Sequence, residues 1–213
     1  MKTQSRHHCL IYDGPPSRKL SLIALIIRQY LDEGYRCLYL NSPALVAGLR
    51  SSLSDMGTDV DQEINNGRLI LSSEPVTEGA VFDWKAMLAE IEESLDQALR
   101  DGYKGLFATG DMTWEFGAAL DLSSLLEYEL GLERIFQRRP ELRGICQYHR
   151  DSLPPDIMRK GLISHSSIVI NETLTKINPL FIKGKLHDQN AENDFELNQV
   201  IDWLCREGTE QIK

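Results

Sequence analysis

Short runs of consecutive apolar residues alternate along this chain with longer segments whose apolar residues recur every three or four positions. Runs of the first kind are typical of strands buried on both faces of a parallel sheet, and segments of the second kind are typical of helices that cover such a sheet. Strands are expected at 8–12, 36–41, 68–73, within 102–110, at 143–150 and at 167–171. Helices are expected at 17–33, 43–56, 59–66, 84–100, 121–138 and 155–164. The pattern predicts one three-layer α/β domain with a mainly parallel central sheet.

Several expected helices carry residues that favour a helix start or stop at their ends. Asp83 precedes the helix at 84–100 and can cap its first turn, and Pro43 lies in the first turn of the helix at 43–56. Gly34 follows the helix at 17–33, where glycine commonly ends a helix. From Lys183 the chain is polar until a short amphipathic helix expected over Phe195–Cys205. We therefore divide the chain into a domain at 1–182 and a C-terminal linker with a short helix at 183–213.

Composition excludes some classes of partner. The chain of 213 residues is 42% apolar, which is enough for one domain with a full core. Its 23 Lys and Arg residues against 32 Asp and Glu residues give a net charge of −9, which argues against direct binding of nucleic acid. The apolar run Leu22–Ile27 is too short to cross a membrane, so we expect a cytoplasmic protein. The four cysteines are widely spaced and are expected to be free thiols: Cys9, Cys37, Cys146 and Cys205.

Ligands of parallel α/β sheets bind at the carboxyl ends of the strands. The segments expected there are Tyr12–Lys19, Asn41, Ser73–Glu74, Thr109–Glu115, Gln147–Arg150 and Asn171–Thr173. The first of them, DGPPSRKL, occupies the place of a nucleotide-binding phosphate loop, G-x-x-x-x-G-K-[ST].

This loop lacks most of what phosphate binding requires. When Lys19 is aligned with the lysine of a phosphate loop, Asp13 and Arg18 replace the two glycines and Leu20 replaces the Ser or Thr that binds magnesium. The dipeptide at 15–16 is Pro-Pro, which removes two backbone donors. No cofactor is therefore expected, MgATP included, although Lys19 keeps a divergent nucleotide site open as an alternative.

The stretch TGDMTWEFG at 109–117 places the carboxylates of Asp111 and Glu115 beside Met112, Trp114 and Phe116, directly after an apolar strand. An acidic residue at a strand end is also found in nucleotide hydrolases, and an aromatic wall with a carboxylate is a suitable lining for a small-molecule pocket. The alternative is a helix start, capped by Asp111 or Thr113, with Trp114 as a core residue.

Cysteine and histidine residues offer only a weak metal pattern. Cys146 and His149 have C-x-x-H spacing, and Cys9 lies on a strand that is expected to be central. Residues three apart on a strand point to opposite faces, so a zinc site of Cys9, Cys146 and His149 is disfavoured and no metal is expected. We expect His165 at the surface or in a loop and His7 in a flexible N-terminal segment.

The order of these pieces resembles the MEDS domain, the methanogen/methylotroph DcmR sensory domain. The resemblance covers residues 7 to 182 and is carried by HHCLIYDG, DEGYRCLYLN, GAVFDW, GYKGLFATGDMTWEF, LLEYELGLE, GICQYHRDSLP, LISHSSIVIN and INPLFI. The family pattern marks His8, Thr109, Gly110, Asp111, Met112, Thr113, Trp114, Tyr128, Glu129, Cys146, Gln147 and Tyr148. His149 departs from this pattern, which has an acidic or Asn-like residue there.

The resemblance implies a RecA/KaiC-like fold that has lost its phosphate loop. It also implies a sensor of small hydrocarbon derivatives that is coupled to a transcription regulator or a signalling protein. No output domain is recognisable in the sequence, so a partner chain or the terminal helix would carry the signal.

The leading hypothesis is a non-catalytic sensory module with a pocket near Trp114, Tyr128 and Tyr148. Its candidate ligand-binding residues are His8, Asp13, Lys19, Thr109, Asp111, Met112, Trp114, Tyr128, Glu129, Gln147 and Tyr148. The expected partners are a small molecule, a regulatory or signalling protein and a second copy of the chain, with no membrane and no nucleic acid. One alternative is a divergent ATP-binding protein or ATPase that uses Lys19 and Asp111, and another is a ligand-free interaction module.

Overall fold

One mostly parallel sheet forms the centre of the computed structural model, which describes residues 6–73, 83–115, 124–171, 174–177 and 199. In this part of the chain the sheet has seven strands in the order β3-β2-β4-β5-β1-β6-β7. The strands are β1 (His7–Tyr12), β2 (Arg36–Leu40), β3 (Leu69–Ser72), β4 (Leu106–Asp111), β5 (Leu142–His149), β6 (Ser167–Asn171) and β7 (Leu174–Ile177). Strands β1 to β6 pair in parallel, and β7 pairs antiparallel with β6.

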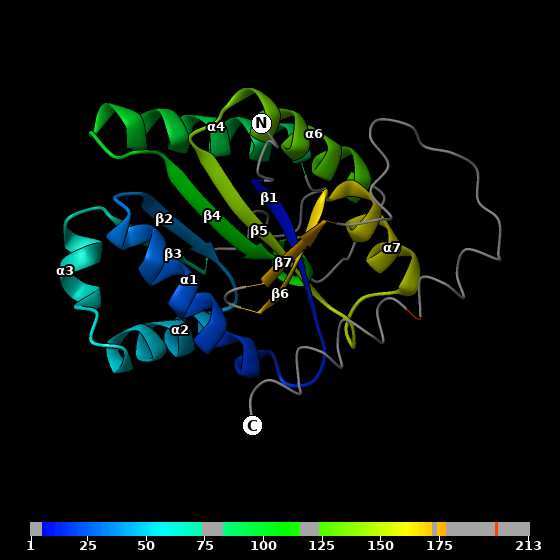
Figure 1. The fold of residues 1–213 in the computed structure, drawn as a ribbon, viewed down its shortest axis with the longest axis horizontal. Coiled ribbons are helices and arrows are strands. Elements are labelled where there is room, and N and C mark those ends of the chain that lie inside the picture. Colours follow the sequence, from blue (N-terminus) through cyan, green and yellow to red (C-terminus); the bar gives the residue numbers. More distant parts are fainter. Residues whose placement is uncertain (1–5, 74–82, 116–123, 172–173, 178–198, 200–213) are drawn as a thin grey trace.

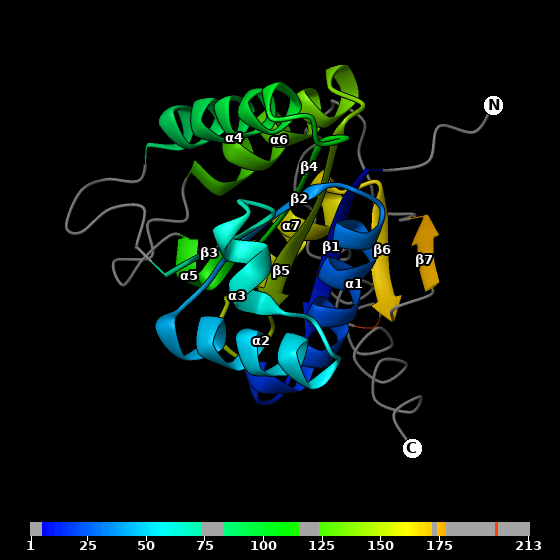
Figure 2. The ribbon, with the colours of Figure 1, turned by 90° about the vertical axis from the view of Figure 1, so that its left-hand side faces the viewer.

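Helices cover both faces of the sheet and give the molecule three layers (Figures 1 and 2). One face carries α1 (Leu20–Asp32), α2 (Pro43–Asp55) and α3 (Val60–Asn65), with the 3-10 helix η1 (Pro16–Lys19) leading into α1. The other face carries α4 (Trp84–Arg100), α6 (Leu125–Arg138) and α7 (Pro155–Ser164). The short helix α5 (Met112–Glu115) follows β4 directly. The predicted three-layer α/β class is therefore confirmed.

Local sequence signals explain several helix ends. The Asp83 side chain accepts hydrogen bonds from the backbone N–H groups of Lys85 and Ala86 and so caps α4. The Ser42 side chain caps α2, with Pro43 at the first helical position. Gly34 adopts φ +89° after α1, a left-handed conformation that glycine accepts without strain.

The expected strands and helices agree with the structure to within a few residues at most ends. The helix expected at 17–33 begins one residue earlier, as the 3-10 turn η1, with Pro15 at its N-cap and Pro16 as its first residue. Strand β7, with the sequence LTKI, was not expected. The tail helix expected over Phe195–Cys205 and the domain boundary at residue 183 lie almost entirely outside the described residues, so they stay predictions.

The sheet separates two hydrophobic cores. Strand side chains alternate between the faces, so Cys9, Cys146 and Tyr148 pack under α4, α6 and α7, whereas Leu10 and Ile145 pack under α1 and α2. We call these the α6 face and the α1 face of the sheet. The ion pair Arg138–Glu92, 2.6 Å long, joins α6 to α4 at the surface.

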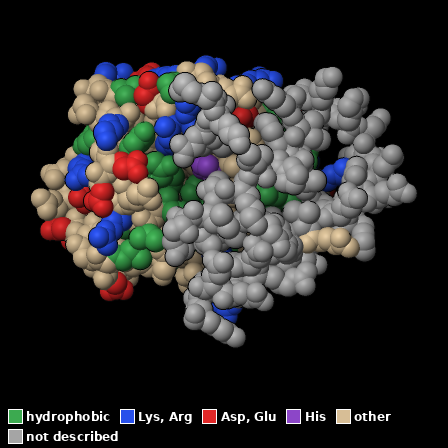
Figure 3. All heavy atoms as spheres, viewed as in Figure 1, with side chains coloured by type: hydrophobic (Ala, Val, Ile, Leu, Met, Phe, Trp, Pro, Cys, Tyr) green, Lys and Arg blue, Asp and Glu red, His purple; other side chains and the backbone are tan. Residues whose placement is uncertain are grey.

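Lys, Arg, Asp and Glu side chains are interspersed on the described part of the view in Figure 3. Among the described helices, none combines the length and the apolar character that crossing a bilayer requires.

Candidate functional site

The residues that the sequence singled out lie on both faces of the sheet. Asp111, Thr109 and Gln147 belong to the alternating positions of β4 and β5 that point to the α1 face. A second group, formed by Met112, Tyr128, Glu129 and Tyr148, lies on the α6 face, where all but Glu129 belong to the apolar core and Glu129 contacts the Tyr148 hydroxyl. The structure therefore brings the candidates together in two groups with the sheet between them.

Asp111 is held by hydrogen bonds on the α1 face. The Tyr12 hydroxyl donates to Asp111 Oδ2 over 2.5 Å, and the Thr113 N–H donates to Asp111 Oδ1 over 2.8 Å. Asp111 is only 4% exposed, and burial raises the pKa of Tyr12, as does the negative charge of Asp111. The carboxylate thus caps the start of α5, as the capping interpretation of this stretch expected.

Thr109 and Gln147 are partners of each other in the same buried layer. Gln147 Nε2 donates to Thr109 Oγ1 over 2.9 Å, and Thr109 Oγ1 donates to the Ile145 carbonyl over 2.7 Å. These bonds link β4 to β5 and give both Gln147 Nε2 and Thr109 Oγ1 hydrogen-bond partners inside the protein.

The loop after β1 is closed by contacts with the loop after β5. Gly14 adopts φ +69°, and its N–H donates to Asp151 Oδ2 over 2.8 Å, while its carbonyl oxygen lies 2.8 Å from His149 Nε2. Asp13 and Lys19 flank this closed turn, both half-buried, and Lys19 occupies the N-cap position of α1 without a side-chain capping bond. In a phosphate loop this backbone N–H would donate to a phosphate oxygen. Here the Gly14 N–H already donates to the Asp151 carboxylate.

His149 does not approach the cysteines. Its ring stacks on Tyr12, 4.9 Å between centroids, on the α1 face, whereas Cys9 and Cys146 lie on the α6 face. The disfavoured zinc set of Cys9, Cys146 and His149 is therefore not assembled. His8 lies elsewhere again, with its Nδ1 2.6 Å from Ser167 Oγ. Burial, and then the charges of His7 and Arg143, lower the pKa of His8 to about 4.

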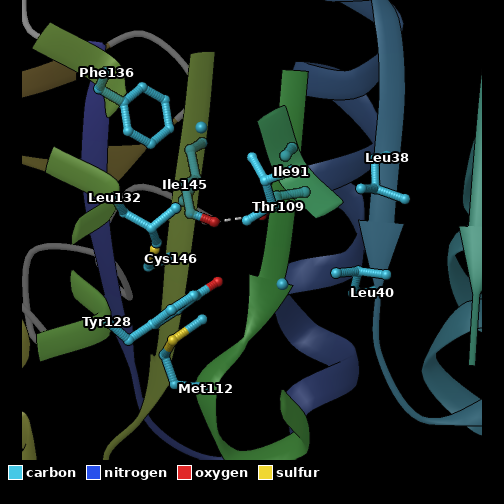
Figure 4. A pocket seen from close by; sticks show the side chains of 13 residues that line it. Leu38, Leu40, Ile91, Thr109, Met112, Tyr128, Leu132, Phe136, Ile145 and Cys146 are labelled. Atoms are coloured by element: carbon cyan, nitrogen blue, oxygen red, sulfur yellow. Dashed lines mark hydrogen bonds between the residues drawn. The ribbon is translucent and has the colours of Figure 1, made fainter. Parts of the chain in front are cut away.

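An apolar cleft opens on the α6 face between the sheet and helices α4 and α6 (Figure 4). The cleft is open to solvent, and the space between its lining atoms, with part of the solvent at its mouth included, is about 390 Å³. Its lining residues are Leu38, Leu40, Ile91, Ala108, Thr109, Gly110, Met112, Tyr128, Leu132, Phe136, Gly144, Ile145 and Cys146. Leu38 and Leu40 lie on one side of the view in Figure 4, and Leu132 and Phe136 lie on the other.

Glycines keep the floor of the cleft free of side chains. At residue 144 a Cβ atom would lie 2.7 Å from Phe136 Cζ, so only glycine allows the Phe136 ring to lie so close to β5. Met112, Tyr128 and Thr109 were expected at a ligand site, and Cys146 was marked by the family resemblance. The family resemblance also marked Gly110. The remaining lining residues were missed, since the spacing of Tyr128, Leu132 and Phe136 indicates an apolar helix face but not that this face meets open space.

A buried polar cluster lies on the same face, which we call the His7 cluster: His7, Glu129, Cys146 and His165. One ligand-type atom from each side chain lies within 4.8 Å of those from the other three, and all four residues are buried. His7 Nε2 lies 3.3 Å from Cys146 Sγ and 3.4 Å from Glu129 Oε2, and His165 Nε2 lies 3.4 Å from the same carboxylate oxygen. The Tyr148 hydroxyl donates to the other oxygen, Glu129 Oε1.

This cluster corrects two expectations. His7 is 1% exposed and begins β1, because β1 is a central strand whose first residue is covered by β5, β6 and α6. His165 is completely buried at the end of α7, with Nδ1 2.6 Å from the Gly161 carbonyl oxygen. The expectation of a flexible segment for His7 is therefore wrong. His165 lies in the connection between α7 and β6, as the loop alternative expected, but it is not at the surface. Which distant residues bury these two side chains could not be read from their neighbours in sequence.

The titratable groups of the His7 cluster shift each other's pKa values. Burial alone would lower the pKa of His7, but its contacts with Glu129 and Glu133 raise it above the ordinary value. Burial, and then the charge of His7, lower the pKa of His165 to about 4. Burial alone would raise the pKa of Glu129, but His165, His7 and Tyr148 hold it below its usual range.

Trp114 lies in α5, but its side chain is outside the described part of the structure, as is that of Glu115. The candidate pocket wall at Trp114 therefore stays a prediction.

Comparison with solved structures supports the fold assignment. The chain is similar to the flagellar accessory protein FlaH from Methanocaldococcus jannaschii, with a TM-score of 0.56 and 12% sequence identity over 77% of this chain and 70% of FlaH. At this identity the likeness shows the fold alone, and it confirms the predicted RecA/KaiC-like architecture. A search of curated proteins gave no significant match. The model of the MEDS family, the MEthanogen/methylotroph, DcmR Sensory domain, matches residues 6–166. The chain therefore belongs to the MEDS family of sensory domains.

Proposed function

We propose that this chain is a non-catalytic sensory domain whose cleft on the α6 face binds a small, mainly apolar molecule such as a hydrocarbon derivative. Membership of the MEDS family supports the sensory role. The choice of ligand class comes from the cleft itself.

The carrying observation is the chemistry of the cleft lining. None of the described residues that line it carries a charge, and most are aliphatic, aromatic or glycine. The Tyr128 hydroxyl and the Cys146 thiol add weakly polar groups that can orient a ligand. Thr109 directs its hydroxyl to the Ile145 carbonyl instead. A charged ligand would lose its hydration here without gaining a partner, whereas an apolar one would bind by removing its surface from water.

The loop after β1 argues against the nucleotide alternative. Its Gly14 amide donates to Asp151, two prolines follow, and Leu20 is buried where a magnesium-binding hydroxyl would be needed. A phosphate group would have to displace the Asp151 carboxylate and would meet the negative charge of Asp13.

Helix α6 is the element best placed to transmit occupancy of the cleft. It supplies Tyr128, Leu132 and Phe136 to the lining, and Glu129 from the same helix belongs to the His7 cluster. A ligand that displaces these side chains changes how α6 packs on the sheet, which a regulatory or signalling partner, or a second copy of the chain, would read. We place this signalling in the cytoplasm.

The test fills the cleft from its floor. Ala108→Leu introduces a larger side chain among the lining residues, and Ala89→Leu is the matched control, because Ala89 lies on the exposed side of α4. The probes are short-chain alcohols and haloalkanes. The expected result is a rise in melting temperature and a shift of the Met112 methyl NMR signal, both retained in Ala89→Leu and lost in Ala108→Leu.

Two results would contradict the proposal. One is an equal probe response of the Met112 methyl in Ala108→Leu and the wild type. The other is MgATP binding by calorimetry that Lys19→Ala abolishes, because this would revive the nucleotide alternative.

A further inference from the structure

We propose that His7, Glu129, Cys146 and His165 bind one Zn²⁺ ion in the core of this domain. The inference shares Cys146 with the lining of the cleft but does not require a cleft ligand, since the fold itself brings these four side chains together from β1, α6, β5 and the end of α7.

The distances within the His7 cluster fit a tetrahedral zinc site. Zinc bonds of about 2.0–2.1 Å to nitrogen or oxygen and about 2.3 Å to sulfur place neighbouring ligand atoms roughly 3.3–3.6 Å apart in a tetrahedron. The observed separations are 3.3 Å for His7 Nε2 to Cys146 Sγ and 3.7 Å for Cys146 Sγ to Glu129 Oε2. Both histidine Nε2 atoms lie 3.4 Å from Glu129 Oε2. These four separations are within a few tenths of an ångström of a tetrahedral edge. The ligand atoms of His165 lie within 4.8 Å of those of His7 and Cys146, and zinc binding draws these pairs together.

Both imidazole rings are oriented as metal ligands usually are. His7 Nδ1 lies 3.2 Å from the Glu133 carboxylate, and His165 Nδ1 lies 2.6 Å from the Gly161 carbonyl oxygen. A proton on each Nδ1 satisfies these acceptors and leaves the Nε2 lone pair directed at the cluster, which is the arrangement that second-sphere acceptors give to zinc-bound histidines. Two such lone pairs facing one carboxylate oxygen repel unless a metal ion, or a proton on His7 Nε2, lies between them.

The Glu129 carboxylate is also oriented for metal binding. Tyr148 donates to its Oε1, so Oε2 is the oxygen that faces both histidines and Cys146. The carboxylate would therefore bind the metal through a single oxygen.

Charge and donor type also suit zinc. A Cys146 thiolate and the Glu129 carboxylate balance the two positive charges of Zn²⁺, and neutral imidazoles add none, so the metal and its four ligands together carry no net charge. Four protein ligands complete a tetrahedron and leave no open position, which is typical of a structural zinc site. Magnesium and calcium prefer oxygen ligands and do not fit this donor set.

The test uses the full chain, purified under reducing conditions. Metal analysis is expected to give one zinc per chain, and replacement by Co²⁺ is expected to give the strong visible bands of tetrahedral cobalt together with a near-ultraviolet thiolate charge-transfer band. Cys146→Ser should remove the charge-transfer band and weaken zinc binding at least about 100-fold. Cys37→Ser is the matched control, because Cys37 is an equally buried thiol on the α1 face.

Two further measurements keep the test decisive if Cys146→Ser fails to fold. X-ray absorption at the zinc edge of the wild-type protein should show one sulfur and three nitrogen or oxygen ligands. Glu133→Gln, a positioning change at His7, should weaken zinc affinity about 10–100-fold without altering the cobalt spectrum.

The proposal is overturned if the reduced wild-type chain binds no zinc, if zinc is bound without sulfur, or if Cys146→Ser leaves the cobalt spectrum unchanged. None of these results depends on the alcohols and haloalkanes, so failure of the zinc site and failure of the cleft proposal are distinguishable.

Discussion

The buried pair of Tyr12 and Asp111 is expected to be a strong contributor to stability, and Tyr12→Phe tests this. The substitution keeps the ring and removes only the hydroxyl that donates to Asp111 Oδ2 over 2.5 Å. Tyr12 is 2% exposed and Asp111 4%, so water cannot readily replace the lost donor. In Tyr12→Phe, the hydrogen bond from the Thr113 N–H to Asp111 Oδ1 remains and the one from residue 12 is lost. Because hydrogen bonds to charged groups contribute about 1.5–3 kcal/mol, we expect the free energy of unfolding to fall by about 2–3 kcal/mol.

Tyr39→Phe is the matched control for this substitution. Tyr39 is 1% exposed on the same face, but its hydroxyl accepts a bond of 2.9 Å from the neutral Asn41 side chain. Loss of a neutral hydrogen bond is expected to cost about 1 kcal/mol. Urea denaturation at neutral pH, followed by circular dichroism and fluorescence, measures both variants.

A double-mutant cycle measures how much of the cost of Tyr12→Phe depends on the negative charge of Asp111. In an Asp111→Asn background no buried carboxylate remains to be stranded, so Tyr12→Phe is expected to cost about 1 kcal/mol or less. If Tyr12→Phe costs the same as Tyr39→Phe, or the same with and without the Asp111 charge, the explanation is wrong. The response of the cleft to its probes should survive in all these variants, because the pair lies on the α1 face.

Two further predictions concern packing. Gly105→Ala places a Cβ atom 2.0 Å from the backbone carbonyl oxygen of Glu141 and should lower the free energy of unfolding, measured by urea denaturation, by about 3 kcal/mol or more. In the control, Gly48→Ala, the new Cβ atom meets only the movable end of the Leu20 side chain, and the free energy of unfolding should hardly change. Similar losses for the two variants would refute this reasoning. Leu132→Ala, beside the cleft, should cost about 2–3 kcal/mol and Leu49→Ala, in the closed core of the α1 face, about 3–5 kcal/mol. Leu132→Ala enlarges the cleft and should gain melting temperature with benzene, and the absence of any gain would count against an open cleft on the α6 face.

Local signals explain which parts of the fold could be predicted. The helix at 84–100 was predicted at both ends, because the Asp83 cap and the spacing of Met87, Ile91 and Leu95 are properties of neighbouring residues. Strand β7 was missed because LTKI has no apolar run, and its pairing with β6 is an edge contact made only in the folded sheet.

In the candidate site, too, some residues were indicated by the sequence and others were found only in the structure. The sequence indicated Glu129, Tyr148 and Cys146 through the family pattern, but it gave His7 and His165 no role. These two residues are 158 positions apart in sequence, and their rings lie 4.0 Å apart between centroids. The strand order, which places β1 between β5 and β6, is what buries both of them.

The sequence by itself determined the alternation of strands and helices, the departure of DGPPSRKL from the phosphate-loop pattern and membership of a sensory family, since each of these depends on residues close together in the chain. Only the tertiary structure decided which face of the sheet each candidate occupies, that Asp111 is used as a cap, where the cleft opens and that the His7 cluster exists. The physical reason is that strand order and side-chain alternation determine which distant residues share a face, and neither is recorded in local sequence.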